Sequence, residues 1–107
     1  MKQISATELA AWLGDAKKAR PQLLDVREDW EFQTCHIAGS KHVPMGEIQA
    51  RAGELPADGD IVVICHHGGR SMQVAMFLEK TGRGGVHNLS GGVDAWAKAV
   101  DPKMPQY

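Results

Sequence analysis

The segment IVVICHHGGRS, residues 61–71, contains the clearest strand of the chain and its best candidate for a nucleophile. Four consecutive β-branched residues, 61–64, disfavour a helix and require burial on both faces, as in a parallel sheet. Cys65 ends this predicted strand, residues 66–70 form a predicted loop, and Ser71 opens a predicted helix. A buried strand followed by a short loop and a helix is typical of an α/β domain.

The rest of the chain continues this alternation of strands and helices. Ser5 and Glu8 have the spacing of a capping box, which predicts a helix from residue 6 to about residue 14. Short apolar runs predict further strands at 22–26, 41–43 and 86–89, and helical spacing predicts helices at 29–34, 45–53 and 93–100. We therefore predict one α/β domain over residues 1–107, built on a mainly parallel sheet.

Composition restricts the classes of protein to consider. The chain has 107 residues, of which 43% are apolar and 23% charged, and this excludes disordered, collagen-like and membrane proteins. A net charge of −1 gives no reason to expect nucleic acid or a membrane surface as a partner. Residues 61–107 are net basic, so a small anion would prefer that half. Because no signal peptide is visible, we expect a cytoplasmic protein whose two cysteines are free thiols.

Cys65 has the surroundings of a reactive thiol. Ligands of open α/β sheets bind beyond the carboxyl ends of the strands, which is where Cys65 is predicted to lie. Gly68 and Gly69 allow successive amides to face one small bowl, and the next helix adds free amides and the positive end of its dipole. Arg70 adds a positive charge at the rim. These features favour a bound anion and the thiolate of Cys65, whereas the alternative is a buried, inert strand cysteine.

Three motifs, in the right order, resemble the rhodanese-like sulfurtransferases over about residues 4–101. The segment 65–71 resembles the active-site loop of that family, and the segment 88–96 (NLSGGVDAW) resembles its downstream motif. The upstream motif is matched by residues 24–28 (LDVRE), with Glu31-Phe32, residues 36–40 (HIAGS) and Val43-Pro44. The resemblance implies a three-layer domain whose sheet has about five strands and helices on both faces.

The resemblance also implies a sulfurtransferase activity. Cys65 would attack a small anionic sulfur donor such as thiosulfate, become a persulfide, and pass the sulfur to a thiol, cyanide or a sulfur-carrier protein. No metal, organic cofactor, nucleic acid or membrane is implied. The substrate would be bound by the loop and helix residues that follow the cysteine, namely His66, His67, Gly68, Gly69, Arg70 and Ser71. The alternative for His66 and His67 is that they are solvated surface residues with no direct chemical role.

Two other functions stay open. From Cys65 to Arg70 the loop is C-x4-R, one residue shorter than the C-x5-R loop of dual-specificity phosphatases that resemble this family. A phosphoryl group needs a wider bowl, which disfavours a phosphatase or an arsenate-type enzyme. Many rhodanese-like domains that have lost the cysteine are non-catalytic interaction or regulatory modules. The presence of both Cys65 and Arg70 argues against that alternative.

The upstream motif departs from the family at Cys35, where glycine is common. Cys35 is either a small residue in a turn or a second redox thiol that resolves a persulfide on Cys65. A metal site made of the two cysteines and their neighbouring histidines is not expected, because the chain has no C-x-x-C spacing. Asp25 and Arg27 are expected to be structural. Arg27 lies four residues before Glu31, so the two would form an ion pair across one helical turn if the helix begins early enough to include Arg27.

Overall fold

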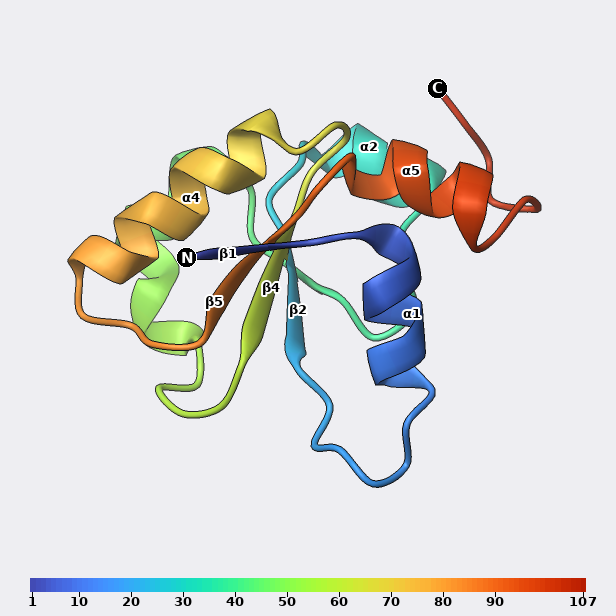
Figure 1. Ribbon diagram of the computed structural model, residues 1–107. Helices are drawn as coiled ribbons and strands as arrows, with labels where there is room; N and C mark the ends of the chain where they lie inside the picture. Colours follow the sequence, from blue (N-terminus) through green and yellow to red (C-terminus); the bar gives the residue numbers. More distant parts are fainter.

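Five strands form the central sheet of the computed structural model, which describes residues 1–107 (Figure 1). They are β1 (Lys2–Ile4), β2 (Gln22–Asp25), β3 (Lys41–His42), β4 (Ile61–Ile64) and β5 (Val86–Leu89). Their order in the sheet is β1-β5-β4-β2-β3, and every neighbouring pair is parallel. The predicted sheet of about five mainly parallel strands is confirmed, and it is parallel throughout.

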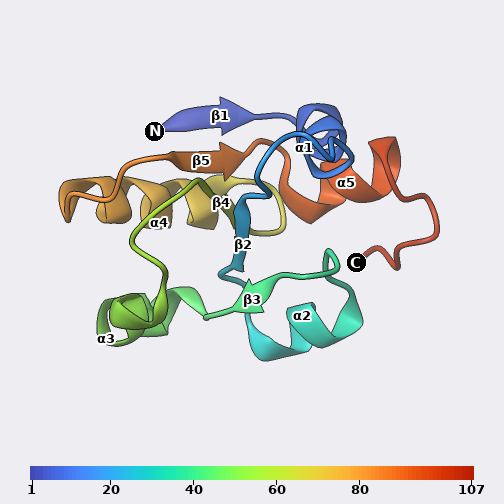
Figure 2. The same ribbon diagram turned by 90° about the horizontal axis from the view of Figure 1, so that it is seen from below.

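Helices cover both faces of this sheet, as predicted. They are α1 (Ala6–Leu13), α2 (Asp29–Thr34), α3 (Ile48–Arg51), α4 (Gly69–Lys80) and α5 (Gly92–Ala99). Figure 2 shows α1, α2 and α5 on one side of the sheet and α3 and α4 on the other. None of these helices combines the length and the apolar character that crossing a membrane requires.

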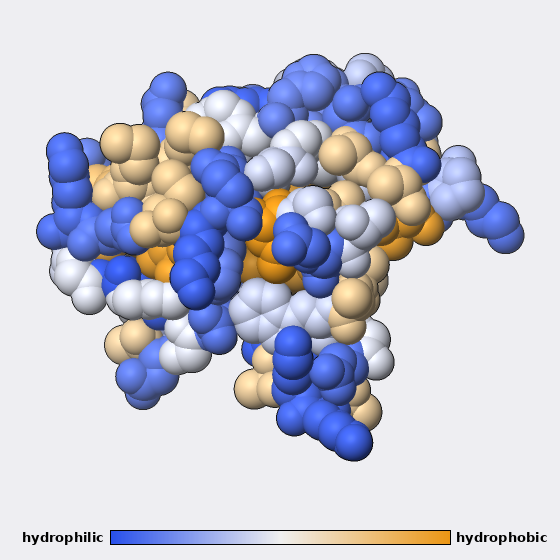
Figure 3. Space-filling view, in the orientation of Figure 1, coloured by the Kyte–Doolittle hydropathy of each residue, from blue (hydrophilic) through white to orange (hydrophobic).

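The core is divided by the sheet into two clusters. Val62 and Ile64 of β4 belong to the cluster under α1 and α5, whereas Ile61 and Val63 belong to the cluster under α4. All four side chains are fully buried, which confirms the prediction that this strand needs burial on both faces. Figure 3 shows that apolar side chains also gather on the outside over α4, where Met72 and Met76 are exposed.

Local differences from the predicted elements have simple causes. The capping box forms, since the Glu8 amide donates to Ser5 Oγ (3.1 Å) and the Ser5 amide to Glu8 Oε1 (2.9 Å). The helix predicted at 45–53 is instead 3₁₀ at Met45–Glu47, α-helical at Ile48–Arg51 and 3₁₀ at Ala52–Glu54. The sequence does not reveal β1, because it has three residues of which only one is buried.

Candidate active site

Cys65 lies directly after β4, at the carboxyl edge of the sheet. Its side chain is buried, and its Sγ accepts a hydrogen bond from the Gly68 amide at 3.0 Å. Gly68 has a φ of +108°, and a Cβ there would lie 3.3 Å from the Gly91 nitrogen, so a larger residue would not fit easily. The predicted loop thus brings a backbone donor to the sulfur at a left-handed glycine.

The helix after this loop begins earlier than predicted. α4 starts at Gly69 and not at Ser71, because Gly68 is its N-cap and accepts a hydrogen bond from the Met72 amide at 3.2 Å. Arg70 and Ser71 therefore belong to the first turn of α4. The positive end of this 12-residue helix lies close to the Cys65 sulfur, where it favours negative charge.

Ser71 connects the sulfur to a buried polar chain. Its Oγ lies 3.3 Å from Cys65 Sγ and is hydrogen-bonded to Asn88 Oδ1. The Asn88 amide group then donates to the Gly68 carbonyl (3.2 Å) and to Gln3 Oε1 (3.0 Å). The single hydroxyl proton of Ser71 is thus donated to Asn88, while the Ser71 oxygen accepts the hydrogen bond of the Cys65 thiol. The sequence marks Asn88 only as part of the downstream motif, although a polar residue in an apolar strand is a clue to such a role.

The start of α5 fixes the carbonyl groups of the loop. The Val93 amide donates to the Cys65 carbonyl (2.9 Å), and the Asp94 amide donates to the His66 carbonyl (3.1 Å). The backbone of Gly92 lies so close to the loop that a Cβ on this residue, whose φ is +57°, would lie 2.3 Å from the Cys65 carbonyl oxygen. The downstream motif therefore binds the loop carbonyls, which leaves the amides of the loop available for an anion.

Arg70, which the sequence predicts as a positive charge at the rim, is paired with Glu31, a partner that the sequence did not indicate. Its Nη1 donates to Glu31 Oε1 at 2.6 Å and its Nη2 donates to Oε2 at 2.9 Å. The Glu31 side chain is only 4% exposed, while Arg70 is 34% exposed. The hydrogen bonds from Arg70 lower the pKa of Glu31 from 4.5 to about 2. The charge of Arg70 is thus largely neutralised within the protein.

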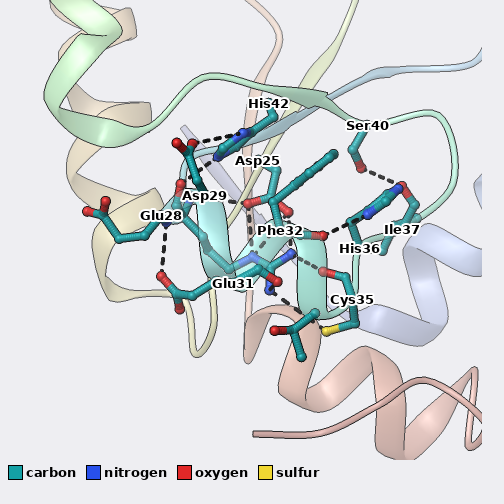
Figure 4. Close-up of polar contacts among 12 residues, drawn as sticks. Asp25, Glu28, Asp29, Glu31, Phe32, Cys35, His36, Ile37, Ser40 and His42 are labelled. Atoms are coloured by element: carbon teal, nitrogen blue, oxygen red, sulfur yellow. Dashed lines mark hydrogen bonds and ion pairs between the residues drawn. The ribbon is translucent and has the colours of Figure 1, made fainter.

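The ion pair between Arg27 and Glu31, expected only for a helix that includes Arg27, does not form. Arg27 binds the Asp25 carboxylate instead, with Nε–Oδ1 and Nη2–Oδ2 distances of 2.9 and 2.7 Å, and both side chains are fully buried. Arg27 reaches only the main-chain carbonyl of Glu31, at 3.3 Å. The helical spacing does not apply because α2 begins at Asp29, after Arg27. Asp25 and Arg27 are structural, as expected, and Figure 4 shows Asp25 beside Glu31 and Cys35 in this network.

The two cysteines are free thiols in different places. Cys35 belongs to the core cluster under α1 and α5, and Cys65 belongs to the cluster under α4. The Cys35 carbonyl accepts a hydrogen bond from Arg27 Nη2 at 2.6 Å, so this residue is part of the structural network. The structure thus favours the reading of Cys35 as a small residue in a turn over that of a second redox thiol.

His66 and His67 form a pair at the mouth of the site. Their ring centroids are 3.9 Å apart, and burial is the main cause that lowers the pKa of His66. With Asp94 they place three potential metal ligands within 4.8 Å of one another. Ligands that share a zinc ion lie about 3.4 Å apart. The three ligand atoms would have to move closer together to share an ion, and Asp94 already binds Lys98 at 3.1 Å.

Comparison with known proteins agrees with this geometry. Residues 5–99 match the family model described as a rhodanese-like domain. The chain is 35% identical over 96 residues to a sulfurtransferase of Allochromatium vinosum, covering 90% of this chain and 88% of that one. Its structure superposes with a TM-score of 0.82 on a rhodanese-like domain protein from Staphylococcus aureus, at 31% identity, covering 90% and 91% of the two chains.

Some relatives are much longer than this chain. The chain is 42% identical over 74 residues to YrkF of Bacillus subtilis, which is described as a putative sulfur carrier protein. That match covers 69% of this chain but only 40% of YrkF. Two further matches, to proteins of Arabidopsis thaliana and Mycobacterium tuberculosis, cover 30% and 26% of the relative. The domain thus occurs within larger proteins as well as alone.

Proposed function

The chain belongs to the rhodanese-like domain family, and we propose that it is a sulfurtransferase that carries sulfur as a persulfide on Cys65. Relatives described as sulfurtransferases support the reaction type. The observation that carries the proposal is the position of the Cys65 sulfur, 3.0 Å from the Gly68 amide and beside the first turn of α4. Such surroundings stabilise a negative charge on sulfur.

The first half of the reaction loads the enzyme. The Cys65 thiolate attacks the outer sulfur of thiosulfate, a new S–S bond forms, and the S–S bond of thiosulfate breaks with both electrons leaving on sulfite. The terminal sulfur of the resulting persulfide carries the negative charge. The amide groups of the loop and the positive end of α4 are the groups that would stabilise this anion.

The second half returns the enzyme to its thiolate. An acceptor thiolate or cyanide attacks the terminal sulfur, takes it, and leaves the electron pair of the broken bond on Cys65. Neither step consumes an oxidant or needs a metal or an organic cofactor. A sulfur-carrier protein is one acceptor class, and the similarity to YrkF supports it.

The ion pair with Glu31 changes the role that Arg70 can have. Because the guanidinium already makes two hydrogen bonds to a buried carboxylate, its attraction for a donor anion is weaker than that of a free arginine. We therefore assign the anion binding to the backbone amides and the helix terminus together with Arg70. Arg70 contributes a fixed donor at the rim of the loop.

Paired cysteine variants test the proposal. Cys65→Ser should abolish thiocyanate formation from thiosulfate and cyanide, whereas Cys35→Ser should keep most of it. Both residues are buried cysteines, so each variant is the matched control for the other. Equal losses in the two variants would contradict the assignment of Cys65 and indicate a relay that uses both thiols.

A further inference from the structure

Tyr107 lies against the active-site loop although it is far from it in sequence. The chain folds back after α5, and Met104 is buried in the core cluster under α1 and α5. This places the Tyr107 ring parallel to that of His66, with centroids 4.0 Å apart and planes at 15°. His66 directly follows Cys65, so the tyrosine covers the beginning of the loop.

The hydroxyl group of Tyr107 reaches the carboxylate that pairs with Arg70. It donates to Glu31 Oε2 at 2.7 Å and accepts a hydrogen bond from Arg27 Nη1 at 2.9 Å. Burial raises the pKa of Tyr107 to about 12, so at neutral pH the hydroxyl keeps the proton that it donates. Tyr107 thus joins the side chains of two ion pairs, Asp25–Arg27 and Glu31–Arg70, which are also linked by the hydrogen bond from Arg27 to the Glu31 main-chain carbonyl.

The orientation of the Glu31 carboxylate depends on few donors. Two of its hydrogen bonds come from Arg70, which it positions. The only other side-chain or backbone donors to it are the Glu28 amide (3.0 Å) and the Tyr107 hydroxyl. Removing the hydroxyl therefore removes one of the two bonds that hold the carboxylate independently of Arg70. It also takes away a partner of the buried Arg27.

We propose that Tyr107 is a positioning residue of the sulfur-donor site, which holds His66 by stacking and Arg70 through Glu31. The proposal rests on the proposed function only in that Arg70 contacts the donor. Tyr107 is 37% exposed, so its ring also forms part of the surface beside the loop. Its contacts are with His66, Glu31 and Arg27 and not with the Cys65 sulfur, so it acts on donor binding and not on the sulfur chemistry.

Tyr107→Phe tests the hydroxyl and Tyr107→Ala tests the hydroxyl and ring together. The Phe variant should raise the KM for thiosulfate about fivefold, which corresponds to the free energy of one hydrogen bond. Its kcat should change less than about twofold. The Ala variant should raise it further. Thr81→Val is the matched control, since it removes one side-chain hydroxyl bond, 2.7 Å to Leu78, at the far end of α4. It should leave the KM unchanged.

Alkylation of Cys65 gives a readout that needs no sulfur transfer. The rate with anionic iodoacetate, divided by the rate with neutral iodoacetamide, reports whether a positive group is held beside the sulfur. Tyr107→Phe should lower this ratio in the wild-type protein. When Arg70→Ala is already present, adding Tyr107→Phe should not change the ratio. Urea titration of each variant establishes that it is folded under the assay conditions.

These measurements separate the two proposals. A wild-type protein that never gains sulfur would contradict the proposed function, while the alkylation ratio would still decide the role of Tyr107. An unchanged ratio in Tyr107→Phe, or an equal fall with and without Arg70, would overturn the positioning role.

Discussion

Glu31→Gln is expected to destabilise the protein in a pH-dependent way. The carboxylate is buried and accepts two hydrogen bonds from Arg70. A pKa lowered from 4.5 to about 2 corresponds to roughly 3 kcal/mol of stabilisation. Because Arg70 is 34% exposed, solvent screening reduces this to about 2 kcal/mol. The variant should therefore lose about 2 kcal/mol of unfolding free energy at pH 7.

The sign of the pH dependence follows from the direction of the shift. A carboxyl whose pKa is lowered by folding stabilises the protein fully above pH 4.5, and this stabilisation is lost as the pH falls toward about 2. Wild type and Glu31→Gln should therefore differ most at neutral pH and converge on acidification. Urea titrations between pH 7 and pH 3 measure this difference directly.

A surface pair provides the control for this experiment. Glu47 makes an exposed ion pair with Arg51, at 2.9 Å, and Glu47→Gln should change the stability little at any pH. If Glu31→Gln were also neutral at pH 7, or if its cost did not shrink on acidification, the reasoning about this buried carboxylate would be refuted.

Three further substitutions test other parts of the site. Arg70→Ala should raise the KM for thiosulfate about tenfold. An unchanged KM would show that the backbone amides bind the anion without Arg70. Gly92→Ala should lower the free energy of unfolding by about 3 kcal/mol or more in urea titrations, because φ is +57° and a Cβ would meet a carbonyl oxygen at 2.3 Å. Gly84→Ala is the control and should cost far less, because a Cβ there would meet nothing within 4 Å. Similar losses in the two variants would contradict this packing argument. Ser71→Ala should lower the unfolding free energy by about 1–3 kcal/mol, since Asn88 Oδ1 loses its donor, and wild-type stability by the same titration would show that this buried bond contributes nothing.

The sequence predicts the central part of this site well, because it is local. A run of four β-branched residues specifies β4, and the glycines after Cys65 specify the turn into α4. Both features depend on neighbours within a few positions, where backbone preferences decide the conformation. The sequence does not reveal that α4 begins at Gly69, two residues before the predicted start, because a left-handed glycine at the N-cap cannot be distinguished from a loop glycine by residue type alone.

The second layer of the site could not be predicted, because it depends on contacts between distant residues. Glu31 and Arg70 are 39 positions apart, and Tyr107 is 76 positions from Glu31. Helical spacing suggested Arg27 as a partner of Glu31, but α2 begins only at Asp29, and Arg27 pairs with Asp25, two positions before it. Charge patterns identify which groups need partners, but only the tertiary contacts of Glu31 with Arg70 and Tyr107 decide which partners it receives.

Intact-protein mass spectrometry tests the central claim most directly. Protein treated with thiosulfate and freed of excess reagent should be heavier by one sulfur atom, and cyanide or a small thiol should remove that mass. Cys65→Ser should gain nothing, while Cys35→Ser should gain the same mass as wild type. A wild-type protein that gains no sulfur, or a Cys65→Ser variant that still does, would contradict the assignment of Cys65 as the sulfur carrier.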